Sequence, residues 1–218
     1  MNMKPYTYPE DIYTEGDADF DTIKNLGPLA PLAGIWQSDA GMDTSPKADG
    51  AEDSPYIERI EMHPIDAQSN GPQMYYGLRY HIHIVEPDSD ETFHDQVGYW
   101  LWEPITGNLI QTLSIPRGLT AMAVGNADAN AKTFTVTARR GSDTNGISSN
   151  PFLESNFKTE SYTITITIHD DGTWSYHQTT VMQVTGYDKP FEHTDFNTLH
   201  KIGEPTLNPT ALAAQRDA

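Results

Sequence analysis

The feature that most constrains this fold is a series of short segments in which apolar and polar residues alternate. Alternation with a period of two is typical of strands that bury one face. Turn signals separate the segments, and Asp170-Asp171-Gly172 is a clear hairpin signal between two of them. The pattern predicts strands over residues 56–62, 74–85, 93–102, 108–115, 120–124, 133–139, 162–169, 173–185 and 191–202.

Nine or ten such strands, with almost no helical pattern between them, predict an all-β antiparallel fold. An open sheet of this size would expose two unpaired edges, and closure into a barrel removes both. We therefore predict a single up-and-down β-barrel of about ten strands, of the fatty-acid-binding-protein or lipocalin type. A two-sheet sandwich is the alternative arrangement.

The flanking segments predict a simple domain organisation. Residues 1–22 are acidic and dotted with tyrosine, and we expect an extended arm there. The barrel domain is predicted over 23–203, and a tail with room for one short helix over 204–218. Residues 25–33 are apolar but interrupted by proline, which limits them to a short helical turn. The polar stretch 39–55 predicts a loop, and 140–158 predicts a long loop that covers a barrel mouth.

The charge balance excludes some classes of partner. The chain has 13 Lys+Arg against 31 Asp+Glu, for a formal net charge of −18, and no cysteine. An acidic surface cannot bind nucleic acid or anionic lipid by general electrostatics, and no thiolate metal site is available. The N-terminus lacks the pattern of a signal peptide, and no apolar run approaches the ~20 residues that span a bilayer. We expect a cytoplasmic protein that binds neither membranes nor nucleic acid.

The histidines are the residues most able to carry chemistry. His81 and His83 lie two apart on one strand and therefore share a face, and His94 follows across a probable hairpin. Three imidazoles on neighbouring strands are a pattern that holds Zn or Fe, which raises the hypothesis of a metal-dependent enzyme. The alternative is that Tyr80, Ile82 and Ile84 face the core and these histidines face water.

His193 lies in the last predicted strand. It shares its face with Phe191 and Asp195, and it is the better candidate for an imidazole that points inward.

Several short motifs resemble those of the nitrobindin family, the haem-binding relatives of the fatty-acid-binding-protein barrel. The first is Leu-Ala-Pro-Leu-Ala-Gly-Ile-Trp at 29–36, similar to the family's entry into its first strand. The second is Phe-His-Asp-Gln-Val-Gly-Tyr-Trp at 93–100, with Ile-Pro-Arg-Gly-Leu-Thr at 115–120. The third is Pro-Phe-Glu-His at 190–193 with Thr-Leu-His-Lys at 198–201, like the strand that presents the haem's axial histidine.

The chain departs from this family pattern at two places. After Trp36 the family has a Gly-x-Gly-x-Gly stretch, where this chain has Ser38, Ala40 and Met42. Aligned backwards from Leu199, the family's axial histidine falls on Thr194, one residue from His193. A shift of one residue reverses the faces of a strand.

The resemblance implies a haem b cofactor with His193 as the axial ligand of the iron, and Asp195 and Asn197 as nearby residues able to hold that imidazole. It also implies reversible NO binding, or isomerisation of peroxynitrite to nitrate, at a ferric haem. Arg117 is a candidate partner for a haem propionate. Strand positions suggest Met74, Tyr76, His94, Leu113 and Ile115 for the opposite side of the haem.

Two further functions stay open. The barrel could act as a metal-free carrier or sensor of an apolar small molecule, because its tyrosines, tryptophans and methionines suit a cavity lining. The third option is the metal-dependent enzyme built on His81, His83 and His94. An aromatic arm and free strand edges are compatible with a homodimer.

Overall fold

The computed structural model describes residues 6–89 and 91–217. The strands in this part of the chain are β1 (Gly34–Lys47), β2 (Gly50–Asn70), β3 (Gln73–Val85), β4 (Thr92–Trp102), β5 (Asn108–Ile115), β6 (Leu119–Asn126), β7 (Thr133–Arg139), β8 (Ile147–Ser149), β9 (Phe157–Ile168), β10 (Trp174–Val184) and β11 (Phe191–Gly203). The helices are the 3-10 helix η1 (Gly27–Leu32) and the α-helices α1 (Pro151–Asn156) and α2 (Pro209–Asp217).

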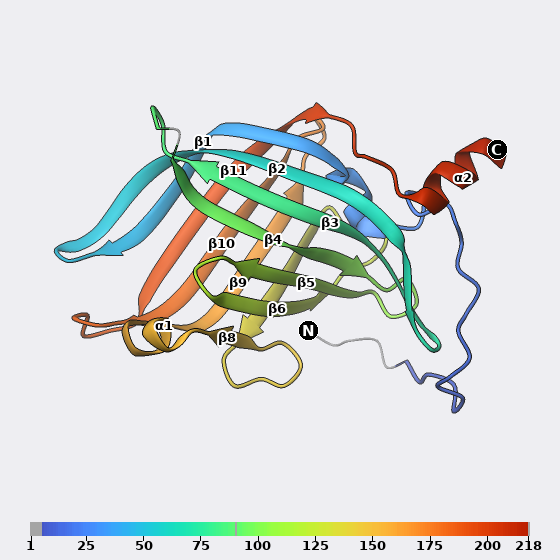
Figure 1. Cartoon of the computed structure of the whole chain (residues 1–218), viewed down its shortest axis with the longest axis horizontal. Helices are drawn as coiled ribbons and strands as arrows, with labels where there is room; N and C mark the ends of the chain where they lie inside the picture. Colours follow the sequence, from blue (N-terminus) through green and yellow to red (C-terminus); the bar gives the residue numbers. More distant parts are fainter. Residues whose placement is uncertain (1–5, 90, 218) are drawn as a thin grey trace.

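The strands close into one barrel. Neighbours pair in the order β5-β4-β3-β2-β1-β11-β10-β9-β7-β6, and an additional β5–β6 pairing closes the ring (Figure 1). Every pairing is antiparallel, and β8 adds an extra short strand beside β6. The prediction of an all-β, up-and-down barrel of about ten strands is confirmed, and the sandwich alternative is wrong.

The first hairpin is longer than the sequence pattern indicates. Residues 39–55, predicted as a loop, continue β1 and β2 as a ladder that runs to the pair Lys47 and Gly50. In Figure 1 this hairpin projects beyond the rest of the barrel. The loop prediction is wrong here because Asp, Ser, Gly and Pro have low strand propensity, yet backbone pairing with a neighbouring strand outweighs propensity.

The segment 140–158 carries structure of its own. It contains β8 and α1, and α1 starts at Pro151 after Asn150, whose side chain accepts hydrogen bonds from the backbone N–H groups of Phe152 and Leu153. Asparagine at the N-cap and proline at the first helical position are typical of a helix start. The segment lies over one end of the barrel, as predicted for a covering loop (Figure 1).

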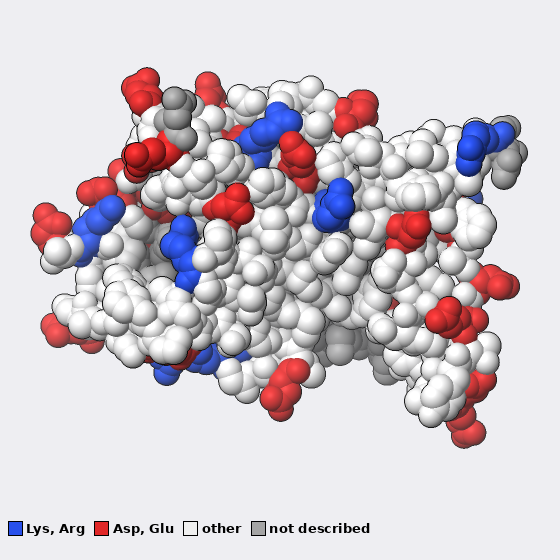
Figure 2. All heavy atoms as spheres, viewed as in Figure 1, with Lys and Arg blue, Asp and Glu red and all other residues white. Residues whose placement is uncertain are grey.

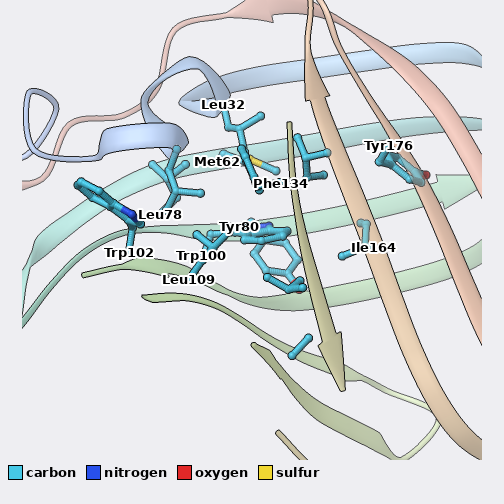
Figure 3. Close-up of a cluster of buried hydrophobic side chains, with 14 of the residues drawn as sticks. Leu32, Met62, Leu78, Tyr80, Trp100, Trp102, Leu109, Phe134, Ile164 and Tyr176 are labelled. Carbon is cyan, nitrogen blue, oxygen red and sulfur yellow. The ribbon is translucent and has the colours of Figure 1, made fainter. Parts of the chain in front are cut away.

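The apolar core fills the other end of the barrel. Leu26, Leu29 and Leu32 around η1 are fully buried, and Figure 3 shows Leu32 beside Met62 and Leu78 beside the indole of Trp102. Gly27 adopts φ +54°, and a Cβ at this position would lie 2.4 Å from the Trp102 ring, so the close packing of η1 on Trp102 requires glycine. Burying this many large side chains at one end closes that end and leaves the interior near α1 free for a cavity.

The described parts of the terminal segments, residues 6–26 and 204–217, contact the barrel without entering the ring. The backbone N–H of Asp19 donates to the hydroxyl of Tyr76 at 3.0 Å, which ties down the N-terminal arm. Beyond β11, the side chains of Asn208 and Thr210 donate to Asp66 of β2, at 2.5 and 2.7 Å. Among the described residues, no helix combines the length and the apolar character needed to cross a membrane.

Candidate functional site

A cavity of about 580 Å³ occupies the barrel interior between the apolar core and α1. The β1–β2 hairpin, the β5–β6 turn and α1 surround its opening, where Lys47, Arg117 and Phe152 line it. Figure 2 shows a hollow with basic side chains beside it, and acidic and basic side chains scattered over the rest of this face. Most of the wall is apolar and consists of Ile60, Met62, Ile82, Ile84, Trp100, Leu113, Ile115, Leu119, Ile147, Leu153, Ile164, Ile166, Trp174 and Met182.

The alternation of β11 places His193 inside the barrel. Its register with β10 is unbroken from Phe191 to Leu199, so alternate residues share a face throughout. Leu199 is buried in the core, and His193 and Asp195 on the same face line the cavity. Thr194, where the family's axial histidine aligns, does not line it.

A β-bulge in β1 brings a second acidic residue to the same place. Between Ser38 and Gly41, β1 holds one residue more than either of its neighbouring strands. The buried positions of β1 therefore change from even numbers, such as Trp36, to odd numbers, and Asp43 points inward. The bulge lies where the chain departs from the family's glycine-rich stretch. Gly41 is required there because a Cβ would lie 2.1 Å from the Tyr56 ring.

Asp43, His193 and Asp195 meet on the inner wall. Asp43 and Asp195 are direct partners across β1 and β11. Nε2 of His193 is hydrogen-bonded to Oδ1 of Asp43 and lies 3.6 Å from Oδ2 of Asp195. Gln178 holds Asp195 by donating from Nε2 to Oδ2 at 2.8 Å. The second oxygen of Asp43, Oδ2, is buried and has no hydrogen-bond partner within the described part of the chain.

The two carboxylates and the imidazole change one another's ionisation. Burial alone would lower the pKa of His193, but the bond to Asp43 and the charges of Asp195 and Asp43 raise it above its usual value. Burial likewise opposes ionisation of Asp43, yet His193 holds the pKa of that carboxyl below its ordinary value. Asp195 is different, because burial and the nearby charge of Asp43 raise its pKa to about 7. The contacts within the cluster therefore favour the charged forms of His193 and Asp43, whereas burial and the charge of Asp43 oppose ionisation of Asp195.

His94 of β4 is a second imidazole in the cavity wall. Its Nδ1 lies 3.3 Å from Nη2 of Arg117, which can only donate. Burial and the charge of Arg117 lower the pKa of His94 to about 4, so this imidazole is neutral at physiological pH. With Nδ1 accepting from Arg117, its proton lies on Nε2.

Glu58 is a buried acid that the sequence analysis missed. Its carboxylate accepts from the Tyr176 hydroxyl at 3.0 and 3.2 Å and from Nδ2 of Asn197 at 2.7 Å. Burial raises the pKa of Glu58 to about 7. The alternation Tyr56, Glu58, Ile60 along β2 could have revealed it, because it places Glu58 on the face of a buried isoleucine. Asn197, expected near His193, bonds this glutamate instead.

The other predicted site residues separate into two groups. Leu113 and Ile115 line the cavity with Arg117 and His94. Met74 and Tyr76 do not line it, because Tyr76 is buried in the apolar core and Met74 packs against that core. Both residues lie on β3, which also contributes to the cavity wall, but they lie nearer the end of the barrel that the apolar core fills.

The structure does not bring His81, His83 and His94 together. His81 bonds Asp95 at 2.9 Å and His83 bonds Thr92 at 3.0 Å, both on the exposed outer face. His94 lies on the inner face opposite Ile84, which lines the cavity. The three-histidine arrangement is corrected accordingly: the sheet separates the first two imidazoles from the third, because His94 lies on the opposite face to His81 and His83.

Comparisons with known proteins agree with this fold. The crystal structure of Rv2717c from M. tuberculosis superposes with a TM-score of 0.56 at 19% sequence identity, and the match covers 83% of this chain and 97% of that chain. At this identity the likeness shows the fold alone. No curated protein sequence matches the chain significantly.

The match to a protein family covers most of the barrel. The family described as "THAP4-like, heme-binding beta-barrel domain" matches residues 25–201. This range contains η1 and every residue that lines the cavity, including His94, Arg117 and His193. The resemblance to nitrobindin-like haem-binding barrels is confirmed. The chain belongs to the family of THAP4-like haem-binding β-barrel domains.

Proposed function

We propose that the cavity binds haem b and that His193 is the ligand of its iron. The observation that carries the proposal is an inward imidazole in a largely apolar cavity, within a chain of a haem-binding family. Apolar walls suit the macrocycle, and a neutral imidazole is a common iron ligand in haem proteins. Arg117 and Lys47 at the opening offer cations for the two propionates.

The residues present fit haem on one condition. The nitrogen of His193 that would bind iron, Nε2, is bonded to Asp43 in this structure. The imidazole must release Asp43 and lose its proton before Nε2 can act as a ligand. Oδ2 of Asp195 lies 3.6 Å from the same nitrogen, so both carboxylates must move away from Nε2 for an iron to bind there.

His94 supports a small ligand on the opposite side of the cavity. Its neutral ring carries the proton on Nε2, which makes that atom a hydrogen-bond donor. Arg117 fixes the ring from the other side, and Leu113 and Ile115 keep the neighbouring wall apolar. When bound, haem supplies an iron centre whose free position suits NO or peroxynitrite. We propose reversible NO binding, or isomerisation of peroxynitrite at ferric haem, as the resulting activity.

The test is a titration of the full chain with haemin, followed at the Soret band. We expect a saturating band with one haem per chain, and at least about tenfold weaker binding in His193→Ala because the iron ligand is lost. His94→Ala should keep the band and change the rate of NO release or peroxynitrite decay. A wild-type protein that stays colourless, or a band unchanged in His193→Ala, would contradict the proposal.

A metal-free carrier of an apolar small molecule is the second candidate. The bond between His193 and Asp43 favours it, because the imidazole already has a partner inside the barrel. A fluorescent fatty-acid probe distinguishes the two functions. A carrier would bind the probe equally well in the wild type and in His193→Ala, and haemin would not displace it.

A further inference from the structure

We propose that Asp43, His193 and Asp195 form a binding site for one divalent cation of the first transition-metal row. The proposal does not rest on haem binding, but a bound cation and a bound haem would compete for His193. One ligand atom from each of the three residues lies within 4.8 Å of the others. Among the described residues, this is the only cluster of three such groups that meets this criterion.

The strand geometry fixes the three groups on one wall. Asp43 and Asp195 are directly opposite one another across β1 and β11, and His193 lies two residues before Asp195 on the same face. Two carboxylates placed opposite each other repel, and burial strengthens the repulsion. A divalent cation bound by both carboxylates would remove this repulsion.

A buried oxygen without a partner points to a ligand. The side chain of Asp43 is 3% exposed, and its Oδ2 makes no hydrogen bond in the described part of the chain. An unpaired carboxylate oxygen in the interior is costly, and native structures retain few such atoms without a reason. Asp43 also lines the cavity, so its side chain lies next to the space that an ion would enter.

The donor set indicates the class of ion. One imidazole nitrogen with two carboxylate oxygens suits Mn²⁺, Fe²⁺, Co²⁺ or Zn²⁺ better than ions that prefer sulfur or oxygen alone. Donors bound to one ion at about 2.1 Å lie at most about 4.2 Å apart, so small side-chain movements would complete the site. Gln178 would orient Asp195 through its 2.8 Å hydrogen bond. Three protein ligands leave positions open towards the cavity for water or an oxygen-bearing ligand.

The test uses the full chain without haem and Co²⁺ as a coloured probe. We expect visible absorption bands that saturate at one Co²⁺ per chain, and Zn²⁺ should abolish them by competition. Losing a residue that only orients a ligand weakens metal binding by about 10- to 100-fold, which we expect for Gln178→Ala. Asp43→Asn and Asp195→Asn remove the ligands themselves and should weaken binding by at least as much.

The chain provides a matched control on its outer face. His81 and Asp95 form an exposed imidazole–carboxylate pair at 2.9 Å, so His81→Ala and Asp95→Asn test adventitious binding by surface histidines. These variants should bind Co²⁺ like the wild type. Bands that are absent from the wild type, or that disappear only in the outer variants, would overturn the proposal.

Two further measurements keep the result interpretable. Far-UV circular dichroism shows whether each variant folds, and a shift in the wild-type melting temperature with Zn²⁺ tests binding without any substitution. Haemin added to the Co²⁺-loaded protein should displace the ion, because both need Nε2 of His193. Co²⁺ bands with no Soret band would support the metal site and contradict haem binding, and the opposite result would do the reverse.

Discussion

Two histidine–aspartate pairs in this barrel share the same strand geometry and differ in the face on which they lie. His81 pairs with Asp95 across β3 and β4, and His193 pairs with Asp43 across β1 and β11. In both cases the histidine is two residues before the residue that lies directly opposite the aspartate on the neighbouring strand. The side chains are 47% and 34% exposed in the outer pair, but 26% and 3% exposed in the inner pair. The comparison teaches that burial, and not the residue types or their spacing, turns such a pair into a candidate site.

Removing the histidine of each pair should give the largest difference in stability between the inner pair and the outer pair. His193→Ala leaves Asp43 and Asp195 facing one another in the interior without a cation, and we expect a loss of about 3 kcal/mol in the free energy of unfolding. His81→Ala should change it by less than about 0.5 kcal/mol, because exposed pairs contribute little. Urea denaturation in the presence of a chelator measures both values at neutral pH. Equal losses in the two variants would show that the inner cluster has no special energetic role.

The acids of β2 extend the comparison between the faces. Burial raises the pKa of Glu58 to about 7, whereas Arg59 holds the pKa of Glu61, on the outer face, below its ordinary value. Between about pH 4.5 and 7 the unfolded chain has lost the Glu58 proton and the folded chain keeps it. Stability should therefore fall as the pH rises through this window, by on the order of 3 kcal/mol. Asp195, whose pKa is also raised to about 7, adds a slope of the same sign, so Glu58→Gln should reduce the slope and Glu61→Gln should leave it unchanged. Urea denaturation at a series of pH values measures both variants. A slope in Glu58→Gln equal to that of the wild type would show that Glu58 does not contribute to the pH dependence.

The bulge in β1 turns Asp43 towards the barrel interior. A substitution at Gly41 tests whether the close packing over this bulge is required. Gly41→Ala places a Cβ against the Tyr56 ring, and crowding of this kind costs about 1–3 kcal/mol. Gly16→Ala is the control, because nothing lies within 4 Å of a Cβ at that position. Thermal unfolding compares the two variants. If Gly41→Ala melts like the wild type, the close packing of Tyr56 over the bulge is not required.

The smallest expected effect concerns the outer pair itself. Asp95→Asn should lower stability by no more than about 0.5 kcal/mol, and added salt should reduce even this difference. Urea denaturation at low and high salt provides the measurement. A larger effect that does not depend on salt would mean that the outer pair is more than a solvated ion pair.

The sequence pattern was sufficient for the barrel, and it favoured His193 as an inward imidazole without settling its face. Alternation predicted the strands because one face of each strand is buried and the other contacts solvent. The alignment from Leu199 pointed instead to Thr194, and it is the buried Leu199 together with the unbroken register of β11 that puts His193 on the inner face. The sequence pattern did not reveal Asp43, because a one-residue bulge between Ser38 and Gly41 reverses the faces of β1 after Trp36. A bulge of this kind depends on the pairing with both neighbouring strands, which local sequence does not encode.

The errors elsewhere have related physical causes. Residues 39–55 resemble a loop in composition, yet the β1–β2 pairing continues through them from Gly41 and Tyr56 to the pair Lys47 and Gly50. Met74 and Tyr76 lie on a predicted strand, but their distance along the barrel axis determines whether they meet the cavity or the core. That distance depends on how many large side chains fill the closed end, as around Trp102 and Leu32, and this is a property of the assembled barrel.

The most direct test of the inner site is chemical rescue of the iron ligand. His193→Gly should bind haemin without the Soret band of the wild type, and free imidazole should restore that band by occupying the space left by the ring. His81→Gly should keep the wild-type band with or without imidazole. A Soret band in His193→Gly that matches the wild type before imidazole is added would contradict the assignment of His193 as the haem ligand.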